Sequence, residues 1–156
     1  MFLTFCQKNA WVDAPWGELP PMKSVRNLQF NNITVNNETG SKNSAFVIVG
    51  MPGHPVENIS FSNIRAIFPG GGTERDLTNS VPVAEFTPEN LGNRWPEIGN
   101  LRRIVPARGL YARHVAGIAL NNIEFGMKTP DARPAVVFDD VTEISTNKSL
   151  APAKSP

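Results

Sequence analysis

A group of aromatic, acidic and basic residues in the second half of the chain has the composition of a site for an acidic sugar. Trp95 and Glu97 lie in a long irregular stretch, and Arg108, Tyr111 and Arg113 follow it. An aromatic ring can stack on the apolar face of a sugar, and a guanidinium can bind a carboxylate through two N–H groups. These five residues are the candidate substrate-binding residues. The alternative is a structural flap, in which the tryptophan fills a gap and the charges are solvated.

The alternation of side chains along a strand predicts that Tyr111 and Arg113 point to the same side. If this part of the chain is a strand, successive side chains point to opposite faces. The apolar residues Leu110 and Ala112 then face inward together with His114, while Tyr111 and Arg113 face outward, available to a groove. His114 is accordingly expected to be a hydrogen-bonded histidine of the core or the edge.

Other residues with catalytic potential have a simpler structural explanation. His54 lies in a turn rich in Gly and Pro, where a hydrogen bond within the turn is the simpler role. Asp139 and Asp140 are an adjacent acid pair, and paired carboxylates hydrolyse glycosides, but they stand where a corner is expected. Asp131 and Arg133 have the spacing of a loop ion pair, which stabilises little when it is exposed.

An internal repeat predicts the elements that position these residues. The pattern Val-x-x-apolar-x-apolar-polar-Asn-Ile occurs at 25–33, 56–64 and 115–123, and a worn copy stands at 136–141. The apolar residues alternate, which is typical of a strand with one buried face. Two small polar residues follow, and Asn and Asp tolerate the left-handed backbone conformation of a sharp corner. In the worn copy, the acid pair takes the place of these corner residues.

Repetition in a fixed order predicts a solenoid, in which each copy is one rung. We expect an all-β fold, a parallel β-helix of three to four coils over 25–145, with like side chains stacked in ladders. A β-sandwich explains the alternation but not the aligned order of the copies. The uneven spacing places a long loop insertion at about 69–107, and solenoids carry such insertions on one face, often the binding face.

Length and composition exclude several classes of function. The 156 residues fit one domain, and a net charge of +1 gives no electrostatic basis for binding nucleic acid or an anionic membrane. No apolar run approaches a membrane span. The single Cys6 leaves no disulfide framework or thiolate cluster, and neither a P-loop, a serine-hydrolase elbow nor a zinc-protease motif occurs. No metal and no other cofactor is expected.

Both ends of the chain differ from the repeat. Residues 1–24 contain Trp and Pro and no amphipathic helix that could cap a solenoid, so they are either an irregular segment over the open end or the start of a truncated stack. We therefore expect a C-terminal part of a larger β-helix whose remainder is missing. Residues 146–156 are small, polar and Pro-rich, which predicts a flexible tail.

Several stretches resemble the C-terminal coils of bacterial polygalacturonase-like proteins, which belong to glycoside hydrolase family 28 in the pectin lyase-like superfamily. The resemblance covers about 25–145 and lies in 51–64, 69–73, 95–97, 108–115 and 131–136. It implies a right-handed parallel β-helix. It also implies a parent enzyme, extracellular or periplasmic, that hydrolyses galacturonate or rhamnose bonds of pectic polysaccharide with inversion.

The catalytic signatures of that family are missing from their expected context. They are Asn-Thr-Asp, Asp-Asp, Gly-His-Gly and Arg-Ile-Lys, on coils that precede the matching segment. No catalytic residue is therefore assigned, and the chain alone is expected to have little or no activity. A non-catalytic β-helix that binds a polysaccharide or has a structural role is the first alternative. A polysaccharide lyase, which shares the fold and abstracts a proton beside a uronate, is the second. The expected partner is a polysaccharide or oligosaccharide.

Overall fold

Strands make up most of the structure. The computed structural model describes residues 2–4, 24–79, 85, 104–147 and 151–152. Most of the two terminal segments and of the 69–107 stretch, with Trp95 and Glu97, therefore lies outside the described residues. The elements are β1 (Phe2–Thr4), β2 (Val25–Asn36), β3 (Phe46–Val49), β4 (Val56–Phe68), α1 (Glu74–Asn79), β5 (Leu110–Met127), β6 (Val136–Asn147) and β7 (Ala151–Pro152).

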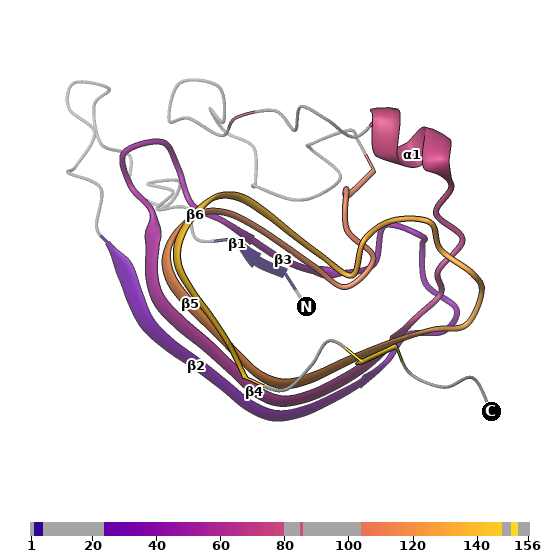
Figure 1. Cartoon of the computed structure of the whole chain (residues 1–156), viewed down its shortest axis with the longest axis horizontal. Coiled ribbons are helices and arrows are strands. Elements are labelled where there is room, and N and C mark those ends of the chain that lie inside the picture. Colours follow the sequence, from indigo (N-terminus) through magenta and orange to yellow (C-terminus); the bar gives the residue numbers. More distant parts are fainter. Residues whose placement is uncertain (1, 5–23, 80–84, 86–103, 148–150, 153–156) are drawn as a thin grey trace, which may run out of the picture.

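The seven strands form one curled sheet in which every strand pairing is parallel (Figure 1). The chain crosses this sheet in four successive passes: β1 with β2, β3 with β4, β5 alone, and β6 with β7. The long strand β5 pairs with β3 and then β4 on one side, and with β6 and then β7 on the other. The prediction of an all-β chain with parallel strands is confirmed.

The register aligns the three full copies of the repeat. Val25 pairs with Val56, which pairs with Val115, and the same holds for the later apolar positions of each copy. The alignment of the worn copy was wrong, because Val141 pairs with Val115, at the start of the repeat. The acid pair before it therefore does not occupy the Asn-Asn corner.

Left-handed residues bend the strands where the sequence predicted corners. Asn32, Asn63 and Asn122 have φ angles of 57°, 55° and 55°. Their carboxamides form a ladder: Asn122 Nδ2 donates to Asn63 Oδ1 at 2.8 Å, and Asn63 Nδ2 donates to Asn32 Oδ1 at 3.1 Å. A second ladder was not predicted; there Asn58 Nδ2 donates to Asn27 Oδ1 at 3.3 Å, and both residues are again left-handed.

The inward-facing residues fill the curl of the sheet with a core of aliphatic and aromatic side chains. Phe30 stacks on Phe61 with ring centroids 4.9 Å apart, and Phe46 contacts Phe61 at 6.1 Å. A buried side chain of this size contributes about 1.5–3 kcal/mol through the surface it removes from water. A second, smaller apolar cluster lies on the other face of β3 and β5, where Val47 and Tyr111 pack with residues of the 104–107 segment.

The stretch predicted as a loop insertion contains the short helix α1. Thr73 precedes the helix, and Asp76 lies in its first turn. The Asp76 carboxylate accepts hydrogen bonds from the Thr73 backbone N–H at 2.8 Å and from its hydroxyl at 3.0 Å. The Asp76 side chain thus satisfies the N–H that precedes the helix, which is one half of a capping box, with Asp in place of the usual Glu or Gln. The Thr-x-x-Asp spacing in the sequence was the signal that the prediction missed.

Candidate functional site

Polar side chains gather beside β5 and β6, and one residue of the long segment between β4 and β5 joins them. We call this group the Arg113 cluster. It consists of Glu85, Tyr111, Arg113, His114, Asp139 and Asp140.

Two aligned left-handed residues explain why neighbours in sequence meet here. In a flat strand, Arg113 and His114 would point to opposite faces. His114 has a φ of 50°, which bends the strand, and both side chains reach the carboxylate of Glu85. Asp140, with a φ of 53°, bends β6 at the matching position, since Arg113 pairs with Asp139 and Val115 with Val141. The assignment of His114 to the inward face was wrong for this reason.

Arg113 and His114 each contact two carboxylates of the cluster. Arg113 pairs with Glu85 through Nη2, and its Nε lies 3.3 Å from Asp139 Oδ2. The two ring nitrogens of His114 lie 2.8 Å from Glu85 Oε2 and 2.5 Å from Asp140 Oδ2. Arg113 and His114 are buried, whereas about two fifths of each of the Glu85 and Asp139 side chains, 41% and 43%, stays exposed. The Arg113 and His114 side chains are thus held in place while the carboxylates remain open to water.

Tyr111 joins the cluster through a hydrogen bond to Asp139. Its ring lies on the face opposite the main core, as predicted, but it is buried in the second apolar cluster rather than open to a groove. Its hydroxyl donates to Asp139 Oδ2 at 3.0 Å. Burial, and then the hydrogen bond to this carboxylate, raise the pKa of the Tyr111 hydroxyl far above its ordinary value. Tyr111 is therefore a permanent donor that orients Asp139.

The other predicted site residues fall into two groups. Trp95 and Glu97 lie outside the described residues. Arg108 precedes β5, and its backbone N–H donates a hydrogen bond to the carbonyl oxygen of Pro134, just before β6, at 2.9 Å. Within the described part of the chain, its buried Nε has no hydrogen-bond partner. Glu85 was missed by sequence reasoning, since nothing local connects it with residues 28 and 29 positions away.

The Arg113 cluster places a histidine between two carboxylates, which differs from the site of an inverting glycoside hydrolase. An inverting hydrolase keeps its two carboxyl groups about 6.5–9.5 Å apart, with room for a water molecule between them. Here the imidazole of His114 lies between Glu85 and Asp140 and contacts both. Arg113 and His114 instead share one carboxylate, each through a different oxygen of Glu85. An arginine and a histidine that face the two oxygens of one carboxylate can hold the carboxylate of another molecule in the same way.

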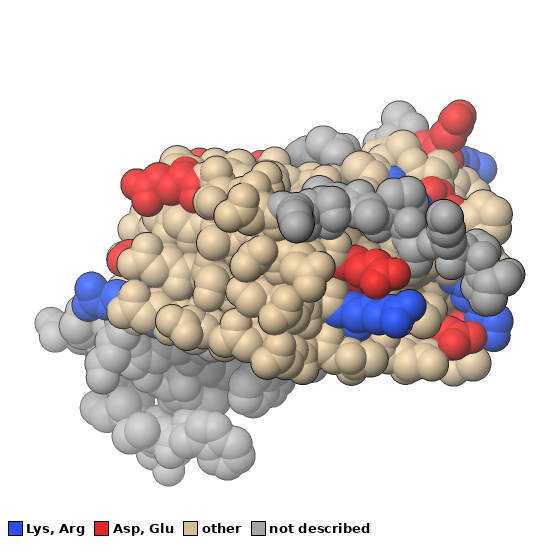
Figure 2. All heavy atoms as spheres, turned by 60° about the horizontal axis from the view of Figure 1, so that its bottom comes forward, with Lys and Arg blue, Asp and Glu red and all other residues tan. Residues whose placement is uncertain are grey.

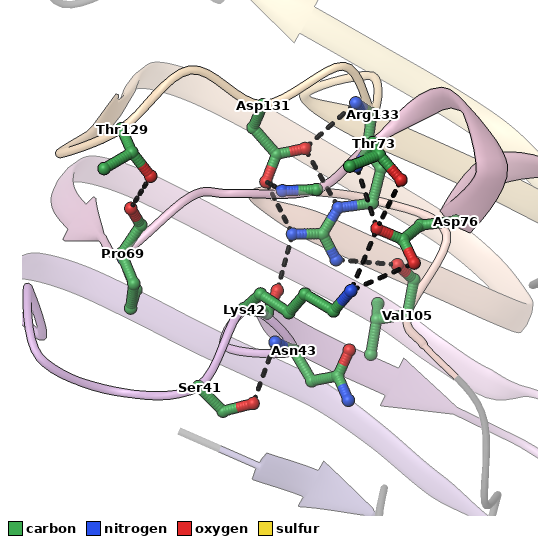
Figure 3. Close-up of polar contacts among 11 residues, drawn as sticks. Ser41, Lys42, Asn43, Pro69, Thr73, Asp76, Val105, Thr129, Asp131 and Arg133 are labelled. Atoms are coloured by element: carbon green, nitrogen blue, oxygen red, sulfur yellow. Dashed lines mark hydrogen bonds and ion pairs between the residues drawn. The ribbon is translucent and has the colours of Figure 1, made fainter.

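A second group of polar residues lies in the turns between passes (Figure 3). We call it the Arg133 node. It consists of Lys42, Gly72, Thr73, Asp76, Val105, Asp131 and Arg133.

The guanidinium of Arg133 is the centre of the node. Its Nε and Nη2 donate to the two oxygens of Asp131 at 3.0 and 2.6 Å, and its other bonds go to the carbonyls of Val105 at 3.0 Å and Lys42 at 2.5 Å. Both charged side chains are buried, with 1% and 0% exposed. The predicted ion pair exists and is buried, so the small stabilisation typical of an exposed pair does not apply to it. It joins three segments that are far apart in sequence.

Two neighbours complete the node. The backbone N–H of Gly72 donates to Asp131 at 3.0 Å, and a Cβ at this glycine would lie 2.3 Å from Arg133 Nε, so only glycine fits. Lys42 pairs with Asp76 at 3.1 Å. The Thr73 backbone N–H, and then the Lys42 ammonium, lower the pKa of Asp76 to about 2. The burial of the Arg133–Asp131 pair and its bonds to backbone groups give the node a structural role.

Comparisons with known proteins identify no relative: no family model, no curated protein and no solved structure matches this chain. In the described residues, no group of three or more His, Cys, Asp or Glu side chains is placed to hold a metal ion. No helix in the same part of the chain is long and apolar enough to cross a membrane.

Proposed function

We propose that this chain is the C-terminal portion of a carbohydrate-active glycoside hydrolase that acts on pectic polysaccharide, and that its Arg113 cluster binds the carboxylate of a galacturonate unit. The supporting observation is the way Arg113 and His114 hold Glu85. Nitrogen atoms of two adjacent residues, Arg113 Nη2 and His114 Nε2, meet the two oxygens of one carboxylate. A uronate presents the same group, on a ring that Trp95 is proposed to stack against.

The proposal includes the finer fold, a right-handed parallel β-helix of three to four coils. Parallel passes in residue-matched register and bends at aligned asparagines support it. In this fold the long segment between β4 and β5 is an insertion on the binding face. Glu97 and Arg108 are proposed to contact further groups of the polysaccharide.

Glu85 occupies the carboxylate site until a ligand replaces it. Its side chain is 41% exposed, so displacing it into water costs less than removing a buried carboxylate. Arg113 and His114 keep their positions in the exchange, because Asp139 and Asp140 hold them from the β6 side. The ligand then meets preoriented donors, which lowers the entropic cost of binding.

Recognition is proposed to act on single uronate units rather than on a broad field of negative charge. Figure 2 shows a face that is mostly without charged side chains, with a few separate acidic and basic groups and no large basic patch. The Arg65–Glu124 ion pair at 3.4 Å is of this separate, exposed kind.

Bond cleavage is assigned to other coils of a longer protein, and this chain alone is proposed to be inactive. The imidazole between Glu85 and Asp140 leaves no room for the water of an inverting reaction. The same observation favours a second candidate, a non-catalytic module that binds polysaccharide. The two candidates share the carboxylate site and differ in whether a catalytic partner segment exists.

Calorimetric titration with a galacturonate oligosaccharide tests the shared claim. The chain should bind it, and should not bind a neutral galactose oligosaccharide of equal length. Arg113→Ala should weaken binding at least about tenfold, since the charge-assisted bonds to a carboxylate are lost. An absence of binding, or equal affinity for the neutral sugar, would contradict the proposal. Unsaturated products that absorb in the ultraviolet would instead identify a lyase.

A further inference from the structure

Among the described residues, the two outermost long strands each have one backbone edge without a partner strand. Within the described residues, β2 pairs only with β4, and β6 pairs only with β5 and not with another strand beyond it. Each is 12 residues long. A long strand edge with free N–H and C=O groups is a template for pairing with another strand.

Apolar side chains at both edges are incompletely covered. On β2, Leu28, Phe30 and Ile33 are only partly buried, whereas the residues they pair with on β4 are buried. On β6, Ile144 is 46% exposed and is the one large exposed apolar side chain among the described residues. One more pass on either edge would remove this surface from water.

The asparagine ladders have a direction, and they stop at β2. Each Nδ2 donates to the Oδ1 of the preceding pass, so Asn58 donates to Asn27 and Asn63 to Asn32. A carboxamide has two donors and one acceptor oxygen. Asn27 and Asn32 therefore present amide donors beyond the edge of β2, and a strand that docks there needs acceptors at the matching positions.

The β6 edge offers such an acceptor. Val141 pairs with Val115, which is aligned with Val56 and Val25, so Glu143 stands at the repeat position of Asn27. Both residues have left-handed φ angles, 54° and 61°. The strands also differ in charge: β2 carries one arginine and no acid, and β6 carries three acids and no base.

We propose that two copies of this chain associate head to tail, with the β6 edge of one copy pairing in parallel with the β2 edge of the next. The internal register continues across the interface, so Ile144 of one copy packs on Leu28 of the other, and Asn27 donates to the Glu143 carboxylate. Because the two surfaces differ, a stack of any length keeps one free β2 edge at one end and one free β6 edge at the other, so the assembly grows as an open filament. A preceding coil in a longer protein would occupy the same edge, so this property is separate from sugar binding.

Sedimentation velocity over a range of concentrations tests the proposal on the 156-residue chain. The wild type should form a series of oligomers. Asn27→Asp keeps the oxygen that accepts from Asn58 but removes the outward donor and faces Glu143 with a like charge, so association should weaken at least about tenfold. The double variant N27D/E143Q restores a donor to the pair and should regain association. Asn121→Asp makes the same chemical change on the internal strand β5 and should have no effect.

Mixing two half-blocked variants tests the head-to-tail geometry. Ile144→Lys blocks the β6 edge at an exposed position where folding is not at risk, and Asn27→Asp blocks the β2 edge. Each variant alone should be monomeric, and the mixture should stop at a one-to-one dimer. A monomeric wild type, a single variant that still dimerises, or N27D and N121D with equal effects would each overturn the proposal.

Discussion

The Arg113 cluster and the Arg133 node each contain an arginine paired with an aspartate, and they differ in what surrounds the pair. Around Arg133 both charges are fully buried, and the remaining donors meet backbone carbonyls of Val105 and Lys42. Around Arg113 the partners are partly exposed carboxylates, and one of them, Glu85, comes from the long segment between β4 and β5. Acceptors fixed in the backbone cannot be exchanged for a ligand, whereas an exposed carboxylate can. The comparison separates a structural arginine, Arg133, from Arg113, for which we propose a role in binding a ligand.

The largest expected effect is the loss of the buried pair. Arg133→Met should lower the free energy of unfolding by about 3–5 kcal/mol, because the Asp131 carboxylate is left buried without its counter-charge. Arg113→Met is the matched control and should cost about 1–2 kcal/mol, since its carboxylate partners can turn to water. Urea unfolding of both variants measures the difference. Equal losses would remove the distinction between the two arginines.

A smaller effect is expected at low pH. The Asp76 pKa of about 2 lies below its ordinary 3.8. Burial by itself would raise the pKa of Asp131, but the hydrogen bonds from Arg133 and Gly72 outweigh it and lower this pKa as well. The unfolded chain therefore binds more protons than the folded chain in this window. The stability from both groups is complete above about pH 4 and is lost as the pH falls toward 2.

Thermal unfolding between pH 5 and pH 2 checks this prediction. Asp76→Asn should lower the unfolding temperature at pH 5. It should also reduce the decrease of this temperature between pH 5 and pH 2, because one of the two groups no longer titrates. Glu124→Gln, which removes a partner of an exposed ion pair, should leave that decrease unchanged. An equally steep decrease in the Asp76→Asn variant would show that Asp76 does not contribute to it.

Sequence reasoning predicted the repeated part of the fold better than the parts that join it. Alternation and the Asn-Asn corners are local signals, and they predicted the strands, the register of three copies and the bends at Asn32, Asn63 and Asn122. The fourth copy was misaligned because Asp139 and Asp140 resemble the corner residues in type. The register shows that they align with Arg113 and His114.

The candidate site was only partly predictable, for physical reasons. Strict alternation fails at a left-handed residue, so the sequence could not show that His114 turns to the same side as Arg113. Glu85 reaches both of them from a distant part of the chain. The burial of Arg133 depends on the turns that contain Lys42 and Val105 closing over it, and no local pattern encodes that contact.

The smallest change gives the most direct test of the central claim, that Glu85 occupies a site for a ligand carboxylate. Glu85→Gln keeps the shape of the side chain and removes its charge, so it competes less well for Arg113 and His114. The measurement is the calorimetric affinity for a galacturonate oligosaccharide, compared with that of the wild type at one ionic strength. We expect binding several-fold tighter in the variant, since less of the binding energy is spent on displacing Glu85. Unchanged or weaker binding would contradict the claim and leave the Arg113 cluster, like the Arg133 node, a structural contact.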